Sequence, residues 1–244
     1  MIDEYLKRIG YDGPHDATLP TLRALHLRHL LTVPFENLDI HVPRMIVLDE
    51  ARIIDKIVRQ HRGGFCYELN GAFAALLRAL GFDVTLLSAR VVSADGKHGP
   101  EFDHMTLLVR IDGKRWLADV GFGESFLLPL SFDEPDDSGY RLQERDGEWG
   151  MQALRDGVWK DDYLFTLTPR ALADYEPMCR FHSTSPESHF SKGPLCSIAT
   201  ENGRITVQRD RIIVTENGEK RQTPIGSDEE WREALQRYFG VVLP

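Results

Sequence analysis

The chain has 244 residues, 42% hydrophobic and 27% charged, so it can bury a sizeable core in one large domain or a few compact units. Its net charge of −9 argues against a nucleic-acid partner, which would normally meet a basic protein face. No apolar run approaches the roughly 20 residues of a membrane helix, and the first residues lack the apolar core of a signal peptide. Three cysteines are too few for a disulfide framework, so we expect a reduced, cytoplasmic protein without a membrane partner.

The first third of the chain has the apolar spacing of α-helices, in three stretches at residues 19–31, 48–64 and 67–82. The second stretch ends at Gly63 and Gly64, because a glycine pair stops a helix. Gly81 is the expected C-terminal cap of the third. This part of the sequence therefore predicts packed helices.

From residue 83 the period changes from helical to extended. Six strand-like stretches run to about residue 168, and Asp-Gly pairs at 112–113, 146–147 and 156–157 are strong signals for tight hairpin turns. We predict an antiparallel meander or barrel here, followed by a short connecting helix. Further hairpin signals, Asn202-Gly203 and Asn217-Gly218, precede a helix from Ser227. Helices followed by strands, instead of alternating units, indicate an α+β protein in three segments.

One cysteine has an unusual setting for a packing residue. Cys66 follows a glycine pair in RGGFCYELN (62–70), at the expected start of a helix. A helix N-terminus and a nearby imidazolium both lower the pKa of a thiol, which makes it a nucleophile. Cys66 is therefore the candidate nucleophile. Cys179 and Cys196 lack this setting, and we expect them to be inert.

A histidine and an aspartate lie where a hairpin would bring them together. His104 opens the strand HMTLLVRI, and Asp119 ends the next strand. If the hairpin turns at Asp112-Gly113, His104 pairs near Val120 and Asp119 lies beside that pair. A register slip of one residue would send Asp119 to the other face. From these residues alone, an inert buried cysteine or a zinc site remains open beside a Cys-His-Asp triad.

Four segments of the chain closely resemble the arylamine N-acetyltransferases: VPFENLDI, RGGFCYELN, HMTLLV and LADVGFG, in that order. His104 follows Cys66 by 38 positions and Asp119 follows His104 by 15, which matches the family's spacing. The resemblance covers about residues 20 to 240. It implies Cys66 as nucleophile, His104 as general base and Asp119 as the carboxylate that orients the histidine.

The resemblance also implies a three-part α+β fold. Residues 1–82 would form a helical bundle with the catalytic cysteine, residues 83–185 a β-barrel with the histidine and aspartate, and residues 186–244 an α/β lid. The chain ends at FGVVLP, before a segment that many bacterial members carry, so we expect a shorter lid over the coenzyme.

The reaction that the resemblance implies is transfer of an acetyl group from acetyl-CoA to an arylamine or arylhydrazine, through an acetyl-cysteine and without a metal. O-acetylation of N-hydroxyarylamines is a further implied reaction. By position, Phe35, Val92 and Phe122 would line the acceptor pocket, and Gly121 and Gly123 would approach coenzyme A.

The coenzyme phosphates would need basic groups outside these motifs. Arg62, Arg180 and Lys192 are candidates, although we favour a structural role for Arg62 between helices.

Other functions share parts of this pattern. An amide synthase of macrolactam assembly has the same triad and takes its acyl group from a carrier protein. A thiol hydrolase related to transglutaminases, or a small-molecule binding module without catalysis, is the more distant alternative. The sequence does not fix the physiological acceptor or the oligomeric state.

Overall fold

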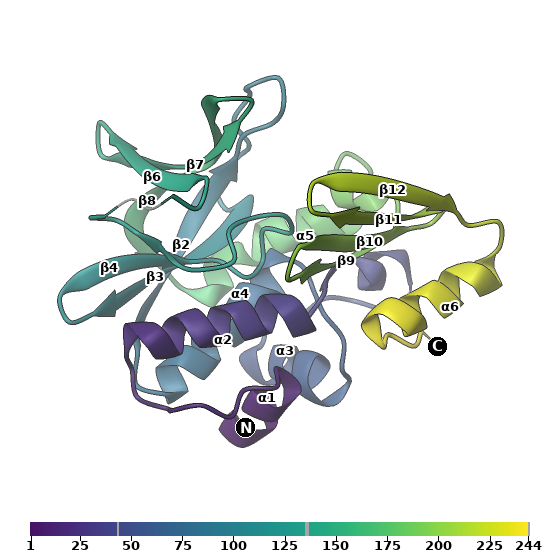
Figure 1. Cartoon of the computed structure of the whole chain (residues 1–244), viewed down its shortest axis with the longest axis horizontal. Coiled ribbons are helices and arrows are strands. Elements are labelled where there is room, and N and C mark those ends of the chain that lie inside the picture. Colours follow the sequence, from purple (N-terminus) through teal and green to yellow (C-terminus); the bar gives the residue numbers. More distant parts are fainter. Residues whose placement is uncertain (43, 135–136, 244) are drawn as a thin grey trace.

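The computed structural model describes residues 1–42, 44–134 and 137–243, which fold into helices, a seven-stranded sheet and a five-stranded sheet (Figure 1). The predicted α+β fold, with a helical bundle, an antiparallel barrel-like sheet and an α/β lid, is confirmed. None of the helices in these described ranges is long and apolar enough to cross a lipid bilayer.

The helical segment is built around one buried helix. Its elements are α1 (Ile2–Arg8), α2 (Leu19–Thr32), β1 (Phe35–Glu36), the 3₁₀ turn η1 (Leu38–His41), α3 (Glu50–Ile54), the π-helical turn η2 (Asp55–Arg59) and α4 (Cys66–Ala79). Every side chain of α4 from Cys66 to Leu77 is buried, so this helix forms the centre of the bundle. Gly81 follows it with a φ of 88°, as expected for a C-terminal cap.

The seven-stranded sheet is formed by the next part of the chain. Its strands are β2 (Asp83–Val91), β3 (His104–Ile111), β4 (Lys114–Ala118), β5 (Leu130–Ser131), β6 (Tyr140–Arg145), β7 (Glu148–Arg155) and β8 (Val158–Arg170), in the order β5-β4-β3-β2-β8-β7-β6. Asp112, Asp146 and Asp156 each have a positive φ before their glycines, so the three predicted hairpin turns are confirmed.

The inner strand β3 is buried on both faces. Leu107 and Val109 belong to the same apolar cluster as α4, whereas Leu108, between them, packs into the barrel interior. The helix with Cys66 and the strand with His104 are therefore held against each other by a continuous core.

The last part of the chain begins with two helices that connect the barrel to the lid, and it ends with a packed helix. It contains η3 (Leu172–Tyr175), α5 (Glu176–Thr184), η4 (His189–Lys192), β9 (Leu195–Thr200), β10 (Gly203–Gln208), β11 (Arg211–Glu216), β12 (Glu219–Pro224) and α6 (Asp228–Phe239). The sheet order is β1-β9-β10-β11-β12, so Phe35 of the first segment pairs with Ser197 of β9. This pairing, which the sequence did not predict, fixes the lid beside the helical bundle.

One hairpin turn differs from its expected form. Gly203 pairs with Thr200, so the turn residues are Glu201 and Asn202 instead of Asn202-Gly203. A Cβ at Gly203 would lie 2.0 Å from the carbonyl oxygen of Thr215, so this glycine is required by close strand packing and not by the turn.

Candidate active site

The glycine pair before Cys66 is explained by close packing against the backbone of Pro34 and the side chain of Glu68. A Cβ at Gly63 would lie 1.9 Å from the carbonyl oxygen of Pro34, and one at Gly64 would lie 2.6 Å from Glu68 Oε2. The same Oε2 accepts the backbone N–H of Phe65 at 3.2 Å, directly before α4. The loop therefore delivers Cys66 as the first residue of α4, where N–H groups have no intrahelical acceptor.

The strand register brings His104 and Asp119 together, with a difference of one residue from the expected pairing. Leu107 pairs with Ala118, so continuing the register sets His104 opposite Gly121, one residue after the expected partner Val120. Asp119, two residues before Gly121, then lies on the same face as His104. The distance from His104 Nε2 to Asp119 Oδ2 is 2.6 Å.

Asp119 is a fully buried carboxylate with four donors. In addition to the bond with His104, it accepts hydrogen bonds from Asn70 Nδ2 at 2.9 Å, Gly121 N at 2.9 Å and Tyr163 Oη at 3.0 Å. Burial opposes its ionisation, but the charge and hydrogen bond of His104, followed by the Asn70 and Gly121 bonds, outweigh burial and lower the pKa of Asp119. Asp119 is thereby held as a carboxylate that fixes the orientation of the imidazole.

Two residues without a predicted role position this carboxylate. Asn70 lies one helical turn after Cys66, so its side chain faces the same strand, and its Oδ1 accepts Val120 N at 2.9 Å. His26 Nε2 accepts the backbone N–H of Asp119 at 3.1 Å. Burial lowers the pKa of His26 to about 4, so it remains neutral at pH 7. The only sequence signal was for Asn70, which ends the quoted motif around Cys66.

A buried ionic cluster lies beneath the loop that leads to Cys66. Arg62 bonds to Glu36 Oε1 and Asp39 Oδ1, each at 2.9 Å, and Lys56 Nζ lies 2.9 Å from Asp39 Oδ2 and 2.7 Å from Glu68 Oε1. These five side chains join α4, η2, β1 and η1. Arg62 therefore has the structural role that we favoured over phosphate binding.

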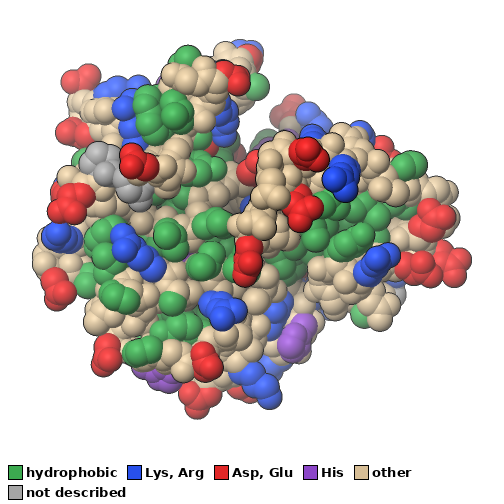
Figure 2. Space-filling model, in the orientation of Figure 1, with side chains coloured by type: hydrophobic (Ala, Val, Ile, Leu, Met, Phe, Trp, Pro, Cys, Tyr) green, Lys and Arg blue, Asp and Glu red, His purple; other side chains and the backbone are tan. Residues whose placement is uncertain are grey.

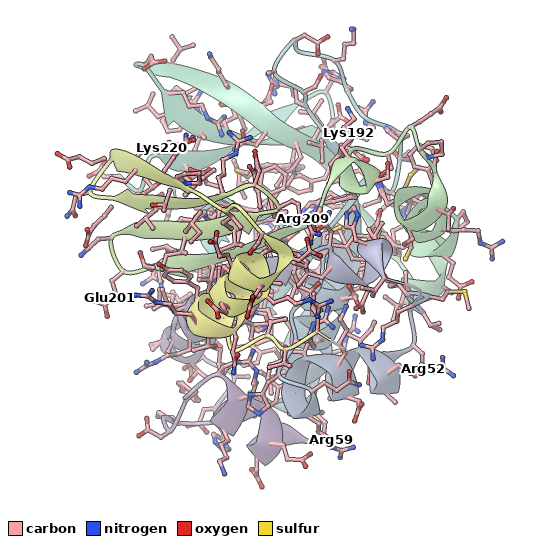
Figure 3. All side chains as sticks on the ribbon, turned by 90° about the vertical axis from the view of Figure 1, so that its right-hand side faces the viewer. Arg52, Arg59, Lys192, Glu201, Arg209 and Lys220 are labelled. Atoms are coloured by element: carbon pink, nitrogen blue, oxygen red, sulfur yellow. The ribbon has the colours of Figure 1, made fainter. Side chains whose placement is uncertain are left out.

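Replacing Arg62 with alanine should destabilise the fold by about 3–5 kcal/mol, because Glu36 would remain buried without its counter-ion and Asp39 would keep Lys56 but lose Arg62. The free energy of unfolding in urea measures this loss. The control is Arg59→Ala, whose side chain extends into solvent with 65% exposure (Figure 3). Equal stability of the two variants would contradict the proposed importance of the cluster.

The expectation that Cys66 is a thiolate by virtue of its helix position is wrong. Its side chain is 3% exposed, and burial raises the pKa of the Cys66 thiol well above its ordinary value. A hydrogen bond from the Met105 backbone amide lowers this pKa, but by less than burial raises it. The charges of Asp119 and Asp103 act in the same direction as burial. A thiolate at neutral pH therefore needs a counter-ion, and we propose His104, which lines the same cavity, for this role.

Alkylation should reveal this dependence. If His104 is the counter-ion that offsets this burial, iodoacetamide at about pH 6 should label Cys66 about tenfold or more faster than Cys179, for which burial raises the pKa to about 12, or Cys196. In His104→Gln the counter-ion is lost, so labelling of Cys66 should need a pH above roughly 8.5, the free value. Peptide mapping by mass spectrometry gives the three rates. An unchanged pH profile in the variant would contradict the pairing with His104.

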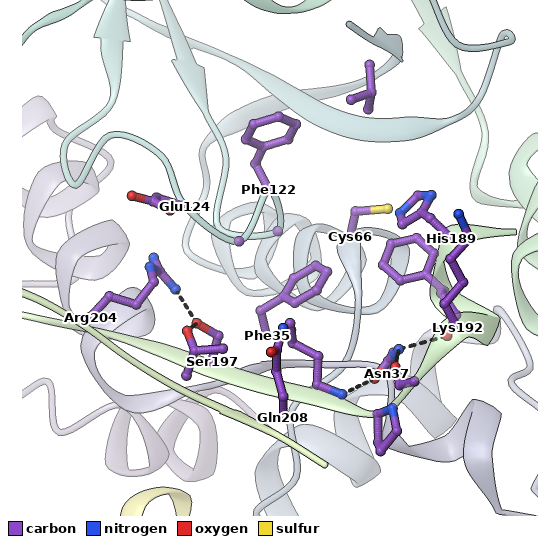
Figure 4. A pocket seen from close by; sticks show the side chains of 18 of the residues that line it. Phe35, Asn37, Cys66, Phe122, Glu124, His189, Lys192, Ser197, Arg204 and Gln208 are labelled. Carbon is purple, nitrogen blue, oxygen red and sulfur yellow. Dashed lines mark hydrogen bonds between the residues drawn. The ribbon is translucent and has the colours of Figure 1, made fainter. Parts of the chain in front are cut away.

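A cavity of about 820 Å³ lies between the two sheets, where the surface is hollowed (Figure 2), and both Cys66 and His104 line it. Of the predicted contact residues, Phe35, Phe122, Gly121 and Gly123 line this cavity (Figure 4). Val92 does not; its neighbour Val91 does, because successive residues of a strand point to opposite faces.

Gly121 and Gly123 are each required at this cavity, for different reasons. A Cβ at Gly121 would lie 2.8 Å from Cys66 Cα, so this glycine is needed for contact with the cysteine itself. Gly123 has a φ of 89°, which favours glycine. Of the basic candidates, Lys192 lines the cavity, whereas Arg62 and Arg180 do not.

This arrangement supports covalent thiol chemistry. Within the described residues no group of three or more histidine, cysteine, aspartate or glutamate side chains is suited to a metal ion. A cysteine at a helix start that shares a cavity with a histidine–carboxylate pair can attack an acyl group and hold it. Enzymes that carry acyl groups on a thiol have this combination of groups.

Comparisons with known proteins agree with that class. The family model described as N-acetyltransferase matches residues 18–244. The arylamine N-acetyltransferase of Escherichia coli (strain K12) is 36% identical over 235 residues, which cover 92% of this chain and 83% of the relative. The chain belongs to the arylamine N-acetyltransferase family.

Solved structures have the same fold. The arylamine N-acetyltransferase from Salmonella typhimurium matches with a TM-score of 0.93 and 30% identity, over 98% of this chain and 90% of that one. The Mycobacterium marinum enzyme in complex with CoA matches with a TM-score of 0.90 and 30% identity, over 98% and 92%. A Bacillus cereus enzyme, described as having a unique Cys-His-Glu catalytic triad, matches with a TM-score of 0.91 and 26% identity, over 99% and 98%.

Proposed function

We propose that the protein transfers an acetyl group from acetyl-CoA to the nitrogen of arylamines or arylhydrazines through an acetyl-Cys66 intermediate. One observation carries the proposal: Cys66 and His104 line one cavity, and His104 is held at 2.6 Å by Asp119. Family membership supports the donor and acceptor classes, and a relative solved with CoA supports the coenzyme. A Salmonella typhimurium relative is also named an N-hydroxyarylamine O-acetyltransferase, which supports O-acetylation as a second reaction.

In the first half-reaction His104 takes the proton of the Cys66 thiol, and the Cys66 sulfur attacks the thioester carbonyl. The bond from carbon to the coenzyme sulfur breaks, and the imidazolium returns the proton to the departing CoA thiolate. Because Asp119 holds Nε2 of His104, Nδ1 is the ring nitrogen that remains for this proton exchange.

In the second half-reaction the acceptor nitrogen attacks the acetyl-cysteine. His104 removes the proton from the attacking amine and returns it to the Cys66 sulfur as the carbon–sulfur bond breaks. The backbone N–H of Cys66, first in α4 and without an intrahelical acceptor, is the donor we propose for the oxyanion. One cysteine serves both halves, so the two substrates alternate.

The cavity has groups of suitable chemistry for both substrates. Phe35 and Phe122 offer ring faces to an aromatic acceptor. For the coenzyme phosphates we propose Lys192, Arg209 and Arg211, which line the same cavity from η4, the β10–β11 turn and the start of β11.

Incubation with acetyl-CoA and a panel of aromatic amines and hydrazines tests the proposal. Acetylated products with release of free CoA are expected. Turnover only with an acyl-loaded carrier protein would favour a macrolactam-type amide synthase, and rapid loss of the acetyl group to water would favour a thiol hydrolase.

A further inference from the structure

Arg204, on β10, lines the cavity without a carboxylate partner. Among the described residues none forms an ion pair with its guanidinium, and its side-chain hydrogen bond runs from Nη1 to Ser197 Oγ at 3.0 Å. Burial lowers the pKa of Arg204, opposed by the nearby Glu124 and Tyr140. A half-buried cation whose one hydrogen-bond partner is neutral has lost water contacts, and the nearby charge of Glu124 replaces them only in part, without a hydrogen bond.

A guanidinium has five donors in a planar fork, which matches the two oxygens of a carboxylate. With Ser197 accepting at Nη1, the remaining donors of Arg204 have no acceptor among the described residues. The cavity therefore presents an anion-binding group that the protein itself does not satisfy.

Arg204 is connected to the aromatic residues of the cavity through its hydrogen-bond partner. That partner, Ser197, pairs across the strands with Phe35. Figure 4 shows Arg204 and Glu124 on one side of Phe35 and Phe122, with Cys66 on the other. A flat ring between the two phenylalanines, with its amine toward Cys66, would direct its far end toward Arg204.

We propose, on the basis of the function proposed above, that Arg204 selects aromatic amines that carry a carboxylate on the end of the ring remote from the amine. Glu124 lines the same side and is exposed, so its negative charge opposes such an acceptor and competes for Arg204. Lys192 lies on the opposite side in Figure 4, which separates the proposed carboxylate site from that candidate phosphate contact.

Two acceptors of nearly the same shape test this: 4-aminobenzoate and its neutral amide, 4-aminobenzamide. Arg204→Met should lower kcat/KM for the acid by about 10-fold or more relative to the amide, the loss expected for a charge-assisted hydrogen bond. Arg204→Lys, which keeps the charge without the fork, should give an intermediate ratio. Glu124→Gln should raise the acid-to-amide ratio above that of the wild type.

Two further measurements separate the possible failures. If Arg204→Met slows acetyl-enzyme formation from acetyl-CoA and leaves the acid-to-amide ratio unchanged, Arg204 contacts the coenzyme and the inference is overturned. An unchanged ratio in a variant with normal melting also overturns it. Calorimetric binding of acid and amide to unacetylated wild type and Arg204→Met needs no turnover: preference for the acid, lost in the variant, supports the site even if acetyl transfer fails.

Discussion

Cys66→Ala should lose at least about 10³-fold in acetyl transfer while the protein remains folded. The nucleophile is removed, so the covalent route is closed, and binding of both substrates cannot replace it. The structural cost is small, because only one buried sulfur atom is lost and alanine is the best helix former at the start of α4. Initial rates with acetyl-CoA and an arylamine, together with thermal melting, measure both quantities.

The matched control is Cys196→Ala. Cys196 is also fully buried, but it packs in the apolar cluster under α6 and does not line the cavity. This variant should retain acetyl-transfer activity within about threefold of the wild type, because it loses only core packing. More than a few per cent of activity in a folded Cys66→Ala protein would refute the role of Cys66.

Asp119→Asn should lower the rate by up to about 10⁴-fold, the loss expected when the orienting carboxylate of a triad becomes an amide. The amide cannot stabilise an imidazolium, and its NH₂ group would face donors from Asn70, Gly121 or Tyr163. Stability should fall as well, since a buried set of donors loses its acceptor. Rates of both half-reactions and urea unfolding give the two losses.

The pH dependence of stability provides a second readout at this position. The folded-state pKa of Asp119 is lowered, so its contribution is present above the ordinary value of about 4 and is lost as the pH falls through the lowered value. This acid-sensitive component should be absent in Asp119→Asn. Tyr163→Phe, which removes one of four donors, is the control and should lose much less activity. Equal rates for Asp119→Asn and wild type would contradict the orienting role.

Local patterns predicted the elements that carry the candidate triad. The change from helical to alternating periodicity at residue 83 and the Asp-Gly turns followed from local backbone preferences, and β2, β3 and β4 were found there. The helix α1 was not predicted, because seven residues are too few to establish a period. The switch to the π-helical turn η2 within a helical pattern also had no sequence signal.

Contacts between distant segments were beyond the sequence. The pairing of β1 with β9 joins Phe35 and Ser197, and the bond from Asp119 N to His26 joins residues 93 positions apart. Neither has a local pattern, because each depends on how whole segments pack. The raised pKa of Cys66 is of the same kind: the sequence showed a helix start, but burial, which decides the direction, comes from the assembled core.

The covalent intermediate is the central claim, and intact-mass spectrometry after mixing the protein with acetyl-CoA alone tests it most directly. We expect one added acetyl group, mapped to the peptide that contains Cys66, absent in Cys66→Ala and discharged when an arylamine is added. Double-reciprocal plots at several amine concentrations should then be parallel. An unmodified protein that still transfers acetyl groups, with intersecting plots, would contradict the acetyl-cysteine route.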